Sequence, residues 1–220
     1  MKKRKTWLAG ALFAFWSLGV WASEVGLVTA LSGNVKLLEE KSAALELRPF
    51  VKVRDGDQLA LAANARLQLV FFEGGRQETW QGDGRLAVGS QSSKALKGGL
   101  QLETRMLPAI LVKQLSKTPS PDGNVKAGMV RLRTLPSLET LESVERRYAD
   151  LRQQAEAGDR SPELYLLASY FELRAFEKLE ALIGQIGEKS PQDQEVVALA
   201  ALYARAIREV KTAEPATEAR

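Results

Sequence analysis

Hydrophobic and polar residues alternate along the chain between Val25 and Gly89. A period of two is typical of β-strands that bury one face. The alternating runs are separated by turn sequences such as Ser32-Gly33-Asn34 and Arg54-Asp55-Gly56-Asp57. We therefore predict a small all-β domain over residues 23–92. Its strands are expected at Val25–Ala30, Val35–Leu37, Phe50–Val53, Leu59–Leu61, Leu67–Phe71, Gln77–Gln81 and Leu86–Val88.

The clearest hairpin joins the run that ends at Phe71 to the run that carries Trp80, through the turn Glu73-Gly74-Gly75. Because side chains alternate between the faces of a strand, Phe71 and Phe72 should point to opposite sides. One of them then lies outside the β core. It is either covered by the second half of the chain or forms an exposed aromatic patch with Trp80.

The period changes to 3.6 from Ser137 onward, which predicts helices over residues 137–210. Gly158 and Gly187 are expected to end helices, and Ser161-Pro162 and Ser190-Pro191 to start them. Residues 211–220 are expected to form a flexible tail. Residues 93–136 follow neither period. We expect a linker up to Gly99, a possible end of the β layer at Leu100 and Leu102, a short helix at Ala109–Leu115 and a possible return strand at Met129–Arg133.

Residues 1–22 have the layout of a signal peptide. A basic start, Met1–Lys5, precedes the apolar run Trp7–Leu18, and small residues precede Ser23. We expect cleavage after Ala22; the alternative is an uncleaved inner-membrane anchor. Both interpretations place the rest of the chain in the periplasm.

The composition excludes several classes of function. The chain has no Cys and no His, which removes disulfides, thiolate nucleophiles, His-based triads and the usual zinc sites. Its net charge is +4, but four of its 31 basic residues lie within 1–22. The remaining 27 basic residues match the 27 acidic ones, so we expect no nucleic-acid partner.

Candidate chemistry is sparse. Asp55, Asp57 and Asp83 lie beside glycines and are interpreted as turn residues rather than cation ligands. Glu73 and Glu78 could be the two carboxylates of a glycosidase, but we interpret them as solvated charges at strand ends. Five arginines have two interpretations: a cluster that binds an anionic glycan or lipid head group, or a charged helix face interleaved with Glu142 and Glu145. They are Arg131, Arg133, Arg146, Arg147 and Arg152. We predict no catalytic residues, no metal and no cofactor. The possible partner-binding residues are Phe72, Trp80, Tyr170 and Tyr203.

Two stretches resemble known families. The Gly26…Gly33-Asn34-Val35 opening, the turn within Val53–Leu59 and the strand and turn Ala65–Gly75 resemble the FecR-type periplasmic domain. The resemblance implies a small twisted all-β module. The few residues before the apolar run leave no room for a sigma-factor-binding domain, so we do not expect that family's sigma-regulator role. The second stretch resembles a tetratricopeptide repeat through Leu164, Leu167, Ala168, Phe171, Phe176, Leu179 and Pro191.

The predicted fold class is therefore α+β: a FecR-like β domain followed by a tetratricopeptide-like helical mini-bundle. We expect a non-enzymatic envelope scaffold or adaptor that binds another protein. The alternatives are a module that binds peptidoglycan or another glycan through its β half, and a membrane-anchored signal-relay component.

Overall fold

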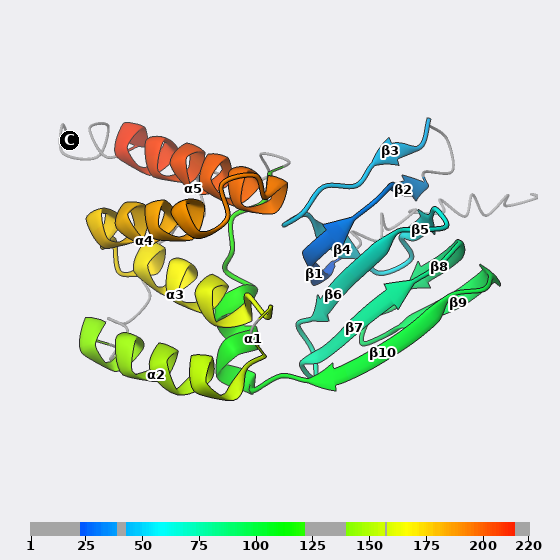
Figure 1. Ribbon diagram of the computed structural model, residues 1–220, viewed down its shortest axis with the longest axis horizontal. Coiled ribbons are helices and arrows are strands. Elements are labelled where there is room, and N and C mark those ends of the chain that lie inside the picture. The colour runs from blue at the N-terminus through cyan, green and yellow to red at the C-terminus, as the bar shows by residue number, and fades with distance from the viewer. Residues whose placement is uncertain (1–22, 39–42, 122–139, 157, 214–220) are drawn as a thin grey trace, which may run out of the picture.

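The computed structural model describes residues 23–38, 43–121, 140–156 and 158–213, and within them the fold is α+β (Figure 1). In these described ranges, ten strands form two antiparallel sheets, and five helices follow. Sheet A contains β1 (Glu24–Ser32), β4 (Lys52–Arg54), β6 (Arg66–Phe71), β7 (Arg76–Gln81) and β10 (Gln101–Met106). Sheet B contains β2 (Val35–Leu38), β3 (Leu45–Glu46), β5 (Gln58–Leu61), β8 (Gly84–Val88) and β9 (Ser93–Gly98). The helices are α1 (Ala109–Leu115), α2 (Leu141–Gln154), α3 (Ser161–Glu172), α4 (Phe176–Lys189) and α5 (Gln194–Ala213).

The strand order is β10-β7-β6-β1-β4 in sheet A and β3-β2-β5-β8-β9 in sheet B. All seven strands predicted from alternation are present. Consecutive strands such as β1 and β2, or β7 and β8, belong to different sheets, because a turn redirects the chain between them. The two sheets therefore form a sandwich whose inner faces share one core.

The expected linker before Gly99 is wrong. Residues 93–98 form β9, which pairs with β8, and β10 pairs with β7, so one long hairpin runs through both sheets. Gly98 lies at the bend with φ +97°, and a Cβ there would come within 2.2 Å of the Asp83 carbonyl oxygen. Only glycine fits this corner. The pattern missed these strands because β9 and β10 are exposed along their length and show no hydrophobic alternation.

The inner faces of the two sheets enclose the first core. Its strand residues include Val28, Val35, Leu59, Leu61, Leu67, Leu69, Phe71, Trp80, Leu86 and Val88. The expected hairpin is confirmed, with Leu67, Leu69 and Phe71 on the inner side of β6. The sandwich therefore has an apolar core that forms without any disulfide bond.

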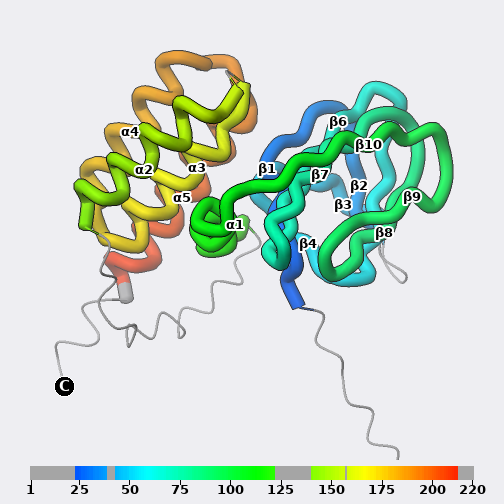
Figure 2. The backbone as a smooth tube through the Cα atoms, turned by 90° about the horizontal axis from the view of Figure 1, so that it is seen from below, coloured from blue at the N-terminus to red at the C-terminus, as the bar shows by residue number. Residues whose placement is uncertain are grey.

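The outer face of sheet A is the floor of a second core. Leu27 and Val70 are fully buried there and belong to one apolar cluster with Leu111 and Leu115 of α1. Phe72 packs against the same cluster, so the prediction that Phe71 and Phe72 face opposite sides is confirmed. Figures 1 and 2 show α1 between the sandwich and the other helices. Sheet A is thus the central layer of a three-layer arrangement.

The four later helices each pack against the next one along the chain. α3 is the central helix, because Leu164, Tyr165, Leu166, Leu167 and Ala168 are all buried. The Phe171 ring of α3 lies against Tyr203 of α5, with 5.9 Å between the ring centroids. Arg174 has φ +56° in the short connection between α3 and α4, and the Ala175 N–H donates to the Tyr170 carbonyl oxygen there.

Two predicted helix starts need correction. Ser161 does not cap α3 through its own side chain; its N–H donates to Asp159 Oδ1 at 2.9 Å. α5 begins at Gln194 rather than at Ser190-Pro191, and Asp193 Oδ1 accepts from the Glu195 N–H. In both cases an Asp two residues upstream supplies the acceptor, because its short carboxylate reaches the free N–H groups of the first turn.

Other predictions concern residues outside the described part of the chain. These are the signal peptide, the return strand at Met129–Arg133 and most of the tail, although α5 itself extends to Ala213. None of the described helices combines the length and the apolar character that crossing a membrane requires.

Two polar contacts join the helical layer to the strands. Glu195 Oε1, at the start of α5, accepts from the Leu31 N–H of β1 at 2.7 Å. Burial raises the pKa of Glu195. On the other side, Arg105 of β10 forms an ion pair with Asp159, just before α3. These contacts orient the helices on sheet A.

Glu78 is a further correction, because this residue is buried and not a solvated strand-end charge. Its side chain points from β7 into the space between the sheets and is fully buried. The carboxylate accepts from Trp80 Nε1 at 3.0 Å, from Arg76 Nε at 2.7 Å, and from the N–H and hydroxyl of Ser93. Since Ser93 begins β9, Glu78 fastens sheet A to sheet B.

The shared outer core predicts that both halves unfold together. Trp80 is the only tryptophan after residue 22, so its fluorescence reports on the sandwich and ellipticity at 222 nm reports on the helices. We expect coincident denaturant midpoints for the chain starting at Ser23.

Leu27→Ala should lower both midpoints together, because it reduces the free energy of unfolding by about 2–5 kcal/mol. Leu96→Ala, at an exposed position, is the control. Separate transitions would contradict a shared core.

Replacing Glu78 should weaken the contact between the sheets. Glu78→Ala leaves Trp80 Nε1 and the Ser93 donors without their acceptor in the interior. We expect a loss of about 3–5 kcal/mol in the free energy of unfolding, measured by urea denaturation. Glu73→Ala, an exposed position five residues earlier, is the matched control and should cost under about 0.5 kcal/mol.

Candidate functional site

A pocket of about 900 Å³ lies beside the sheet edges opposite β9 and β10, and it extends as far as Arg85 of β8. Here the described strands end in two free edges, β4 in sheet A and β3 in sheet B. We call this space the edge pocket. Its apolar lining residues are Leu37, Leu38, Leu45, Leu47 and Val51, and its other wall includes Ser120 and Pro121, which follow α1.

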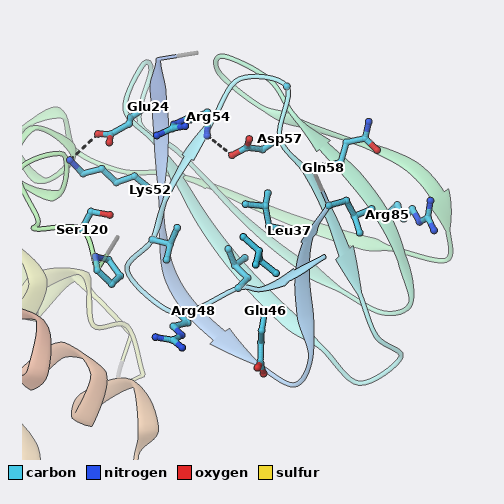
Figure 3. A pocket seen from close by; sticks show the side chains of 16 residues that line it. Glu24, Leu37, Glu46, Arg48, Lys52, Arg54, Asp57, Gln58, Arg85 and Ser120 are labelled. Carbon is cyan, nitrogen blue, oxygen red and sulfur yellow. Dashed lines mark hydrogen bonds and ion pairs between the residues drawn. The ribbon is translucent and has the colours of Figure 1, made fainter. Parts of the chain in front are cut away.

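The pocket exists because the strands that meet here are short. β3 has two residues and β4 has three, so neither covers the inner face of the opposite sheet completely. Leu37 and Leu38 stay partly exposed, and Leu45 is 52% exposed. Figure 3 shows Leu37 between Arg54 and Asp57 on one side and Glu46 and Arg48 on the other. The result is an apolar floor with a charged rim.

Two of the acidic rim residues have structural partners. Glu24 forms an ion pair with Lys52 at 3.0 Å. Asp57 Oδ2 accepts from the Arg54 N–H at 2.8 Å and closes the turn that contains Gly56, whose φ is +90°. The interpretation of Asp57 as a turn residue is therefore confirmed. Within the described residues no group of three or more acidic side chains could hold a metal ion.

Three arginines on the rim remain available. The side chains of Arg48, Arg54 and Arg85 are exposed and form no ion pair with any residue that the structure describes. A guanidinium group presents a planar set of donors that matches a carboxylate. The edge pocket can therefore bind a ligand that combines apolar groups with carboxylates.

None of the described residues that line the pocket is aromatic. Trp80, which we predicted as a possible partner-binding residue, is only 3% exposed and lies in the core between the sheets. Phe72 packs against the helical layer. The aromatic residues of the β half therefore do not form a surface platform in this structure.

The two predicted tyrosines are also interior residues. Tyr203 is fully buried, and burial raises its pKa. Tyr170 is buried, and its hydroxyl donates to Glu145 Oε1 at 2.9 Å. Burial, together with that hydrogen bond, raises the pKa of Tyr170 to about 12. Phe72, Tyr170 and Tyr203 thus belong to one apolar cluster between sheet A and the helices, and Trp80 lies in the other core, so the four do not form a shared binding surface.

The predicted arginine cluster is divided by the structure. Arg152 of α2 forms an ion pair with Glu163 of α3 at 3.1 Å, so its partner lies on the neighbouring helix and not on its own helix face. Arg146 and Arg147 lie exposed on α2, while Arg131 and Arg133 lie outside the described residues. The sequence analysis missed Arg48, Arg54 and Arg85. Arg48 and Arg54 are close in sequence, but Arg85 is more than thirty residues away, and only the pairing of β5 with β8 brings its strand to the same opening.

Comparison with known protein families, curated proteins and solved structures finds no match to this chain. The class that the geometry itself defines is an α+β protein with a two-sheet sandwich, a helical layer on one sheet and an open pocket between the free strand edges.

Proposed function

We propose that this protein is a non-enzymatic adaptor of the cell envelope that binds an extended segment of another protein in the edge pocket. One observation carries the proposal. The pocket lies between two free strand edges and combines a leucine floor with three arginines that have no ion-pair partner in the described residues.

The free edges favour an extended peptide. A strand at the edge of a sheet offers unpaired N–H and C=O groups to another chain, and pockets beside it select alternate side chains. At this opening, apolar side chains of the ligand would contact Leu37 and Leu45, while carboxylates would reach Arg54 or Arg85. The ligand we propose is therefore an extended segment in which apolar and acidic residues alternate.

The pocket chemistry supports binding rather than catalysis. Two of its carboxylates, those of Glu24 and Asp57, are engaged by Lys52 and by the Arg54 backbone. The chain contains neither His nor Cys, which are the commonest general base and the strongest thiol nucleophile.

In this proposal the sandwich is a FecR-type domain, and α3 and α4 form a tetratricopeptide-like repeat. The turns that carry the first resemblance support it, because Gly33, Gly56 and Gly74 have positive φ angles of 75°, 90° and 76°. The sequential packing of α2 to α5 supports the second. Export to the periplasm rests on the signal-peptide layout of residues 1–22.

The glycan-binding alternative is weaker, because the aromatic residues that would stack on a sugar are in the interior. The signal-relay alternative requires residues 1–22 to stay on the exported chain. N-terminal sequencing of the exported protein tests the signal-relay alternative. A chain that starts at Ser23 has lost the segment that would anchor it and excludes the relay.

Site-specific photo-crosslinking in the living cell tests the proposal. Leu45 in the pocket and Leu96 on β9 are equally exposed, at 52% and 51%, so they form a matched pair for a photoreactive amino acid. We expect a discrete protein adduct from position 45 and none from position 96. The same adduct from both positions, or none from position 45, would rule out the edge pocket as the binding site.

A charge reversal on the rim should weaken binding. Arg54→Glu replaces a carboxylate-binding group with a repelling one, so the adduct at position 45 should fall by about tenfold or more. Arg147→Glu on α2 is the control, because Arg147 is equally charged, exposed and distant from the pocket. If Arg54→Glu leaves the adduct unchanged while cell-wall material cosediments with the protein, the glycan alternative replaces the adaptor.

A further inference from the structure

Among the strands that the structure describes, β10 is the other free edge of sheet A, on the opposite side from the edge pocket. All six of its residues are exposed. Leu102 is 41% and Met106 65% exposed, and these two large apolar side chains share one face of the strand with Thr104 between them. Figure 2 views the molecule from below and shows β10 in front of the other strands of sheet A.

The residues Leu102-Glu103-Thr104-Arg105-Met106 read as a self-complementary sequence. If a second copy of β10 pairs with the first in antiparallel orientation, with Thr104 opposite its equivalent, then Glu103 faces Arg105 and Leu102 faces Met106. Opposite charges and apolar pairs directly across two antiparallel strands stabilise the pairing. Centring the pairs on Glu103 or on Arg105 would instead place like charges opposite each other.

The two kinds of contact fall on different faces. One face of β10 carries Leu102, Thr104 and Met106. On β7 the residues directly opposite, on the same face of the sheet, are Trp80, Glu78 and Arg76. Glu103 and Arg105 lie on the other side, where Arg105 already pairs with Asp159. In the paired arrangement the apolar contacts would form on one face and two symmetric ion pairs on the other.

The neighbouring free edge behaves differently. β9 is the edge of sheet B, and it carries Lys94 and Lys97 without any acidic residue. Lysines on an edge strand oppose pairing with another copy, because like charges would meet. The same hairpin therefore carries one edge protected by charge and one edge complementary to itself.

We propose that a second copy of this chain docks on β10 by antiparallel strand addition, with a two-fold axis at Thr104. The interface is isologous, and it joins both copies of sheet A into one continuous sheet. The edge pocket lies at the far edge of each copy and stays open. This proposal concerns the protein alone and does not depend on the proposed function.

Sedimentation equilibrium of the chain from Ser23 to Arg220 tests it. Because a single short strand edge forms a small interface, we expect a weak dimer with a dissociation constant of about 1–100 μM. Glu103→Arg should weaken the dimer by about tenfold or more, since both symmetric attractions become repulsions. Lys94→Glu on β9 is the matched control and should leave the dissociation constant unchanged.

A mixture of two variants keeps the test independent of folding. Glu103→Arg and Arg105→Glu each place like charges across the two-fold axis, so each should be monomeric alone. Mixed together they restore both opposite-charge pairs and should form a heterodimer. Trp80 fluorescence and ellipticity at 222 nm check that the sandwich and the helices of each variant are folded, because Arg105→Glu also removes the ion pair with Asp159. A wild-type chain that stays monomeric at about 0.5 mM, or a mixture that does not associate, would overturn the proposal.

Discussion

The covering of sheet A on both faces is the constraint on which the rest of the structure depends. Its inner residues, such as Phe71, pack against sheet B, and its outer residues Leu27 and Val70 pack against α1. Removing either cover would expose fully buried apolar side chains to water. The two halves of the chain are therefore not independent modules joined by a linker. Arg105 and Glu195 add polar contacts at two places where the layers meet, which orient one layer on the other.

Much of this fold could be predicted from the sequence, for physical reasons. Strands with one buried face leave a period of two, and the helices leave a period of 3.6, so both regions were identified. β9 and β10 were missed because their position depends on backbone pairing with β8 and β7 and not on burial of side chains. Glu78 was misassigned because a carboxylate surrounded by donors from Trp80 and Ser93 is stable in the interior, and no local pattern reveals those donors.

The candidate site was harder to predict than the fold. Aromatic residues were predicted as partner-binding residues. In the structure Trp80 and Tyr203 instead stabilise the cores, because their large rings bury much apolar area there. The edge pocket depends instead on what is lacking locally: β3 and β4 are too short to cover Leu37. Its arginines come from the connection between β3 and β4, from β4 and from β8, and the strand at β8 reaches the pocket only through tertiary pairing.

The order of elements along the chain has a consequence for synthesis. The first strand ends beside the start of the last helix, and Leu31 and Glu195 are 164 residues apart where they bond. A growing chain completes β1 and β6 long before α3 and α5 exist, so the outer face of sheet A has no cover of its own during that time. Contacts between such distant residues form slowly, and an uncovered apolar sheet favours association with other chains. Packing of the helices onto sheet A is then the step that covers its apolar outer face and prevents aggregation.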